Sequence, residues 1–131
     1  MAVLKRENIL EINDIQIETV SVPEWGGEVC VRGMSGAERD RFETSIVEIH
    51  GKRQQVNLSN VRAKLACFCI CDEDGQRLFT EKDINDLAQK SAAALQHIFE
   101  VAQRLSGIGE TDIKELADGL KNAPSDGSIS D

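Results

Sequence analysis

The sequence predicts an α+β fold: one mostly helical domain with an N-terminal β-hairpin, four to five short helices and a disordered C-terminal tail. Two β-rich runs flank a Pro-Glu-Trp-Gly-Gly segment at residues 23–27, which predicts the hairpin. Later segments repeat apolar residues at the period of an amphipathic helix. The chain has 131 residues, 40% hydrophobic and 29% charged, so we expect one soluble domain with its own core. The first 14 residues look like a lead-in, with a helical turn over residues 5–11.

The predicted hairpin carries the only tryptophan of the chain. Residues 15–22 are rich in β-branched side chains, and Pro23 ends this strand because proline cannot donate a hydrogen bond to a sheet. The two glycines after Trp25 permit the positive φ of a reversal. Val29 and Val31 then alternate with polar residues, as in a half-buried strand. We therefore expect Trp25 at the tip of the hairpin.

A helix is predicted to begin at Gly36, because Ser35 and Glu38 have the spacing of a capping box. Gly51 is placed to end this helix. Three apolar residues would lie on its buried face: Phe42, Ile46 and Ile49.

A second helix is expected from residues 57–59 to Cys71. Only Lys64 is polar in its C-terminal half, so the element would be buried on most sides. A strand is the alternative for this half, but Ile70 is its only β-branched residue, which favours the helix. A turn follows at residues 72–75.

The remaining segments are expected to be helical, apart from the end of the chain. Thr80 begins a short helix, and Ser91 begins a longer one whose apolar stripe stops before Gly107. Beyond a glycine hinge, apolar residues again recur at helical spacing. Residues 1–122 would form the domain, and residues 123–131 a disordered acidic tail rich in serine and glycine.

The cysteine triplet Cys67, Cys69 and Cys71 raises the question of a metal site. On a helix, Cys67 and Cys71 share a face but Cys69 points elsewhere, so the three cannot bind one ion. On a strand all three would align, but a structural zinc site would still need a fourth ligand. We interpret them as small apolar core residues in a reducing compartment, and predict no metal.

Catalytic motifs are missing from the sequence. It contains no GxSxG, Walker A or dinucleotide-type glycine pattern, and its two histidines have no partner at a fixed spacing. An enzyme needs at least one converging set of titratable groups. We therefore expect a non-enzymatic protein without cofactor or catalytic residues.

The charge of the chain opposes nucleic-acid binding. Its 23 acidic and 15 basic side chains give a net charge of −8, and acidic residues outnumber lysines from residue 110 to the end. The Gly107–Gly109 turn resembles the hairpin of helix-hairpin-helix DNA-binding modules. Glu110 and Asp112 would oppose a phosphate there.

Membrane association is not expected either. No apolar run approaches the roughly 20 residues that span a bilayer, and the N-terminus lacks the apolar region of a secretory signal. We expect a cytosolic protein with free thiols.

Partner binding is the function that remains. Trp25 either anchors a partner or folds back over the helices of its own domain. The last predicted helix either docks on the domain or meets a partner helix. Six apolar residues of the hairpin and of that helix are the candidate partner-binding positions: Trp25, Val29, Val31, Ile113, Leu116 and Leu120.

The block Val22–Phe42, VPEWGGEVCVRGMSGAERDRF, resembles that of tail assembly chaperones from long-tailed bacteriophages and prophages. The lead-in around Glu7–Leu10 and the segments at residues 57–65, 72–84 and 90–110 are also typical, so the resemblance covers nearly the whole chain. The cysteine triplet departs from the family, whose members commonly have plain apolar residues there.

This resemblance implies a non-enzymatic role in the cytoplasm of a bacterial host. Such proteins bind the tape-measure protein, a long and largely helical chain, keep it soluble, and help recruit tail-tube (major tail protein) subunits. They are absent from the finished virion. Many such phages also make a longer, frameshifted form, and this chain would be the shorter one.

The exposed edge of the hairpin would allow self-association of copies along the tape-measure protein. Two alternatives stay open. One is a different phage morphogenesis protein, such as a head–tail connector or completion protein. The other is a small DNA-binding or regulatory module that uses the Gly107–Gly109 turn.

Overall fold

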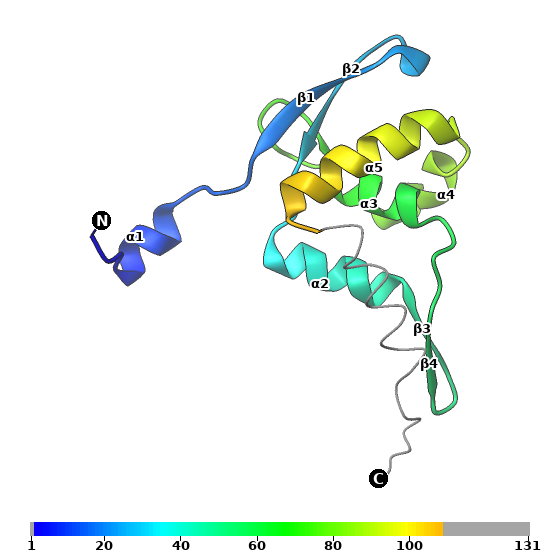
Figure 1. Cartoon of the computed structure of the whole chain (residues 1–131), viewed down its shortest axis with the longest axis horizontal. Coiled ribbons are helices and arrows are strands. Elements are labelled where there is room, and N and C mark those ends of the chain that lie inside the picture. The colour runs from blue at the N-terminus through cyan, green and yellow to red at the C-terminus, as the bar shows by residue number, and fades with distance from the viewer. Residues whose placement is uncertain (1, 109–131) are drawn as a thin grey trace.

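The computed structural model describes residues 2–108 and confirms an α+β fold with an N-terminal hairpin (Figure 1). The chain forms short helices and strands, with 3-10 turns at Pro23–Trp25 and Glu81–Asp83. The elements are α1 (Arg6–Glu11), β1 (Ile17–Val22), β2 (Gly27–Arg32), α2 (Gly36–Ser45), β3 (Val47–His50), β4 (Arg53–Val56), α3 (Val61–Cys69), β5 (Ile70–Cys71), α4 (Ile84–Leu87) and α5 (Ala92–Ser106).

The main sheet has the strand order β1-β2-β5, and both pairings are antiparallel. Val20 lies opposite Val29, so these two side chains share one face of the sheet. The α5 helix packs along this face (Figure 1). Arg104 of α5 also forms an ion pair of 2.8 Å with Glu18 of β1.

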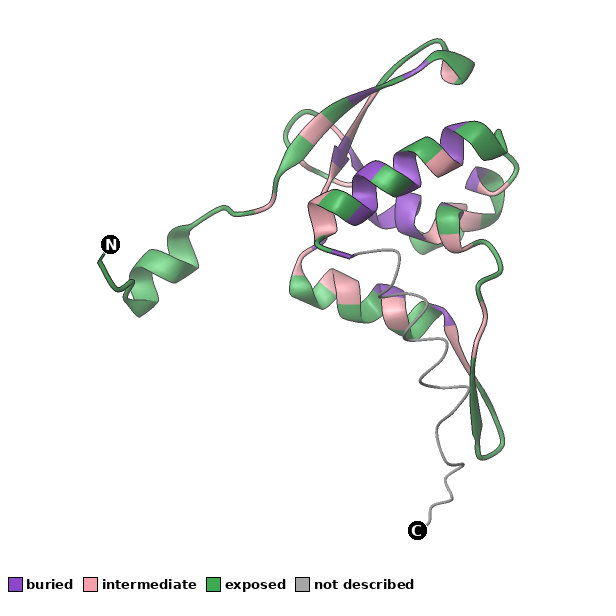
Figure 2. Ribbon diagram, in the orientation of Figure 1, coloured by how far each residue is buried: buried purple, intermediate pink, exposed green. Residues whose placement is uncertain are grey.

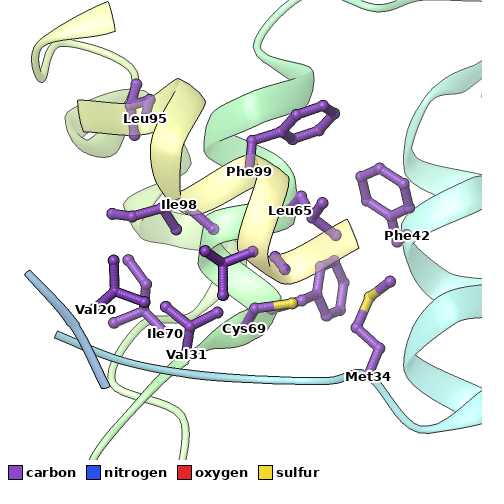
Figure 3. Packing of buried hydrophobic residues seen from close by; sticks show 14 of the residues in the cluster. Val20, Val31, Met34, Phe42, Leu65, Cys69, Ile70, Leu95, Ile98 and Phe99 are labelled. Carbon is purple, nitrogen blue, oxygen red and sulfur yellow. The ribbon is translucent and has the colours of Figure 1, made fainter. Parts of the chain in front are cut away.

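The core lies between the sheet and helices α2, α3 and α5 (Figure 2). Figure 3 shows Val20 and Val31 of the hairpin pointing towards Ile98 of α5. The phenyl rings of Phe42 and Phe68 meet edge to face, with centroids 6.4 Å apart. This aromatic pair joins α2 to α3 within the core.

The end of β2 and the end of α5 approach each other closely. A Cβ atom at Gly33 would lie only 2.5 Å from the carbonyl oxygen of Leu105. The backbone N–H of Met34 donates a 3.0 Å hydrogen bond to the Ser106 hydroxyl oxygen. Glycine is therefore required at position 33 for space.

A second hairpin replaces the end of the first predicted helix. The α2 helix begins at Gly36 as predicted but ends at Ser45, and β3 and β4 follow. Gly51 does adopt a positive φ, of 65°, but in the turn between the two strands. The prediction that Ile49 lies on a buried helical face is wrong, because this side chain is 69% exposed on β3. The cluster of β-branched residues from Ile46 to Ile49 favours a strand.

The α3 helix is shorter than predicted at both ends. It begins at Val61, after Asn60 in the left-handed conformation, and ends at Cys69. Ile70 and Cys71 form β5, because they pair with the neighbouring strand β2. The choice of a helix over a strand is confirmed for all but these last two residues.

The α5 helix agrees with its prediction. The Ser91 hydroxyl accepts a hydrogen bond from the Ala94 N–H, and Gly107 ends the helix with a φ of 72°. The last predicted helix and the predicted tail at residues 123–131 lie outside the described residues, as does the boundary at residue 122.

Candidate protein-binding surface

The tip of the first hairpin places Trp25 at the edge of the core. The 3-10 turn is closed by a 3.0 Å hydrogen bond from the Gly26 N–H to the Pro23 carbonyl oxygen. Trp25 is half-buried: it packs against the main core cluster and leaves part of the indole open to solvent. The side chain therefore contributes to the fold and still offers apolar surface to a partner.

The two valines of the hairpin that were candidate partner-binding residues differ in accessibility. Val29 is half-buried beside the core cluster. Val31 is 0% exposed and points into the core (Figure 3). Of the three candidate residues on the hairpin, Trp25 and Val29 are therefore accessible to a partner and Val31 is not. The other three candidates lie outside the described residues: Ile113, Leu116 and Leu120.

The outer edge of β1 is open within residues 2–108. Gly33 donates its N–H to the Gln16 carbonyl, so the backbone groups of Ile17, Thr19 and Ser21 point away from β2 by the alternation of an antiparallel ladder. The ladder is continuous over β1, which contains no bulge, lysine or proline that would protect the edge. This edge can accept another strand.

The β3–β4 hairpin was not predicted from the sequence. It projects from the body of the domain, and residues 49–55 are all exposed (Figures 1 and 2). Lys52 and Arg53 make its tip cationic within an acidic protein. A glycine-containing two-residue turn between alternating residues was the signal available in the sequence.

The cysteines are arranged for packing. Cys67 and Cys69 lie on α3, whereas Cys71 lies on β5 opposite Cys30. Burial raises the pKa of the Cys69 thiol to about 12. Burial also raises the pKa of Cys67, although Arg77 opposes this effect. Both thiols are therefore protonated at neutral pH and behave as small apolar side chains.

Two arginines, Arg77 and Arg32, form ion pairs within the fold. Arg77 lies over the Phe68 ring at 4.6 Å and donates a 3.1 Å hydrogen bond to Glu81. This hydrogen bond lowers the pKa of Glu81. Arg32 similarly forms a partly buried ion pair with Glu38. Between residues 2 and 108, no three histidine, cysteine, aspartate or glutamate side chains gather where they could hold a metal ion.

In the described part of the Gly107–Gly109 turn, residues 107 and 108, both amides are already hydrogen-bonded within the protein. The N–H groups of Gly107 and Ile108 donate to the carbonyl oxygens of Arg104 and Gln103, at 3.3 and 2.9 Å. Ile108 is buried. As for membranes, each helix in the described part of the chain is too short or too polar to cross a bilayer.

Comparison with known proteins identifies the family. A family model for the phage tail assembly chaperone matches residues 5–119. Among solved structures, the chain is similar to the tail assembly chaperone of bacteriophage HK97, with 19% sequence identity and a TM-score of 0.55, over 76% of this chain and 89% of that chain. This structural likeness shows a shared fold. No curated protein sequence matches the chain at a significant level. Because the family model covers most of its length, the chain belongs to the phage tail assembly chaperone family.

Proposed function

We propose that this chain is a non-enzymatic chaperone that binds the tape-measure protein during tail assembly, keeps it soluble, and helps recruit tail-tube subunits. The match to the family over residues 5–119 is the observation that carries this proposal. One feature of the described residues supports it: Trp25 packs against the core and leaves apolar surface open to solvent.

The hairpin tip is the proposed contact with the tape-measure protein. Trp25 and Val29 are half-buried beside the core and leave apolar surface open, which suits the apolar stripe of a long helix. Many copies that each bind weakly would coat such a chain by avidity. The net charge of −8 would keep the coated assembly soluble.

We also propose how copies of the protein assemble and in which compartment they act. Copies would associate through the open edge of β1, and a longer, frameshifted form would extend the same domain. The protein would act in the host cytoplasm and be absent from the mature virion. The four free cysteines suit a reducing compartment.

Co-expression with a tape-measure fragment tests the proposal. We expect the fragment to become soluble and to co-elute with the chain during size-exclusion chromatography. A fragment that stays insoluble, or elutes alone, would contradict tape-measure binding. Mass spectrometry of purified virions distinguishes a chaperone from a head–tail connector, because a connector would be found in the particle.

A further inference from the structure

Two of the four cysteines form a cross-strand pair on the main sheet. Cys30 on β2 lies directly opposite Cys71 on β5. Directly opposed residues of an antiparallel pair have their side chains on the same face of the sheet. The next pair along the ladder, Val31 and Ile70, belongs to the core cluster, so the two cysteines face the other, outer side of the sheet. The two thiols are therefore neighbours outside the core.

The backbone holds this pair at a separation that suits a disulfide. Gly33 donates its N–H towards β1, so by the alternation of the ladder the backbone groups of Cys30 point to β5. Ile70 accepts a hydrogen bond from Leu78 on its other side, so Cys71 is the residue of β5 whose backbone groups point to β2. Opposed residues of such a hydrogen-bonded pair have Cα atoms about 5.5 Å apart. Disulfides most often join Cα atoms that are about 5.5–6 Å apart.

The pair has one accessible sulfur and one protected sulfur. Cys30 is half-buried, whereas Cys71 is only 2% exposed. The turn after β5 folds back over this face, since a Cβ atom at Gly75 would lie 3.2 Å from Cδ1 of Ile17. Burial raises the pKa of the Cys71 thiol, and the neighbouring Cys30 raises it further. An oxidant in solution would therefore react with Cys30 first.

We propose that Cys30 and Cys71 form a reversible intramolecular disulfide when the chain meets a small-molecule disulfide such as oxidised glutathione. The Cys30 thiolate attacks one sulfur of the oxidant and breaks its S–S bond, which releases one small thiol and leaves a mixed disulfide on Cys30. The Cys71 thiolate then attacks the Cys30 sulfur and releases the second small thiol. The two protein thiols lose two electrons and two protons in total, and the small disulfide is reduced to two thiols.

The bond should be easier to reduce than a structural disulfide. The Cβ atoms of directly opposed residues lie about 4.5–5.5 Å apart, whereas a disulfide holds them at about 3.5–4.5 Å. The two cysteines must move closer together to form the bond, and bonds of this kind are reduced more readily. In a reducing compartment both thiols stay free. The disulfide would therefore form only after the pool of small thiols becomes oxidised, and would open again when that pool recovers.

Incubation of the reduced full-length chain with oxidised glutathione tests the pair. We expect two of the four thiols to be lost, with peptide mapping by mass spectrometry showing Cys30 joined to Cys71 and no glutathione attached. Reduced glutathione should then restore all four thiols while circular dichroism shows that the chain stays folded. The same oxidation in urea is the reference, because the unfolded chain should join its cysteines without this preference.

Two serine variants provide a matched comparison, since each replaces a buried thiol: Cys71→Ser and Cys67→Ser. Cys71→Ser should stop at the mixed disulfide on Cys30, and Cys67→Ser should form the same bond as the wild type. Circular dichroism checks that both variants fold, and if either does not, the mapping of the wild-type chain decides.

Three results with the wild-type chain would overturn the proposal. The first is a chain that keeps glutathione on Cys30 and does not resolve it. The second is a bond from Cys30 to Cys67 or Cys69, or only to a second copy. The third is a Cys30–Cys71 bond that reduced glutathione cannot open in the folded chain. Because Cys30 faces away from Val29, none of these results bears on the proposed contact with the tape-measure protein.

Discussion

Gly33 lies directly against Leu105: a Cβ atom on the glycine would come within 2.5 Å of the leucine carbonyl oxygen. This close approach joins the end of β2 to the end of α5. The neighbouring hydrogen bond from the Met34 N–H to Ser106 belongs to the same junction. The first hairpin and α5, the longest helix of the described chain, can thus pack this closely because Gly33 has no Cβ atom. Gly33 has no positive φ that would require a glycine.

Substitution of this glycine should destabilise the domain. We expect Gly33→Ala to lower the free energy of unfolding by about 1–3 kcal/mol, because the backbone of α5 must move away. Urea unfolding followed by circular dichroism measures the change. Gly36→Ala is the control, since a Cβ atom there meets nothing within 4 Å. Equal losses for both variants would show that the close approach is not the cause.

The Arg32–Glu38 ion pair predicts a pH dependence of stability. Burial tends to raise the pKa of Glu38, but hydrogen bonds from Arg32 and from the Ser35 N–H outweigh this and hold the pKa below the usual 4.5. A carboxyl whose pKa is lowered by folding adds stability above its unfolded pKa. This stability is lost as the pH falls through the lowered value.

Glu38→Gln should therefore cost about 1–3 kcal/mol at pH 7 and less in acid, where the Glu38 carboxyl of the wild type is already protonated and its ion pair with Arg32 is lost. Chemical unfolding of the wild type and of Glu38→Gln, at neutral pH and at a pH well below 4.5, measures the difference in the free energy of unfolding under each condition. Glu43→Gln serves as the comparison, because the side chains of its pair with Arg39 are 37% and 39% exposed, more than those of Arg32 and Glu38, and the change in stability should be about 0.5 kcal/mol or less. A loss for Glu38→Gln that is independent of pH would contradict this account.

Trp25 should contribute to both stability and binding. Because the indole is half-buried, Trp25→Ala should destabilise the domain by less than the roughly 3–5 kcal/mol of a fully buried tryptophan. Affinity for a tape-measure fragment should fall by about 2 kcal/mol. Calorimetry gives the affinity and thermal unfolding the stability, with the exposed neighbour Glu24→Ala as control. Unchanged affinity with a large loss of stability would assign Trp25 to the core alone.

The cysteines should differ in reactivity. Cys30 is partly exposed and should react first with a thiol reagent at neutral pH. Cys69 is fully buried, with a pKa of about 12, and should react only on unfolding. Cys30→Ser should remove the fast phase. Rapid labelling of Cys69 in the folded protein would show that the helix α3 opens readily.

Much of the fold follows from local signals in the sequence. The Ser35 capping box, the turn after Trp25 and the stripe of α5 each depend on neighbouring residues, and each was predicted correctly. The β3–β4 hairpin was missed because Phe42, Ile46 and Ile49 fit a helical period. In strands of four residues, the spacing of apolar residues cannot be distinguished from that of a helix.

Other features depend on contacts between distant segments. Val31 alternates like any half-exposed strand residue, yet it is fully buried because α5 and β5 cover it. Cys71 leaves the helical pattern because β2 offers a partner for it. The family itself was recognisable from the sequence, since the resemblance rests on linear segments that the family model also covers.

The direct junction of α3 and β5 has a mechanical consequence. Helix ends and strand begins at consecutive residues, Cys69 and Ile70, with no linker between them. The strand pairs with β2, whose other end leads to the tip at Trp25. A load applied to the tryptophan would pass through two strands into the most deeply buried helix. Occupancy of the tip by a ligand should therefore slow amide hydrogen exchange in α3 as well as in the hairpin.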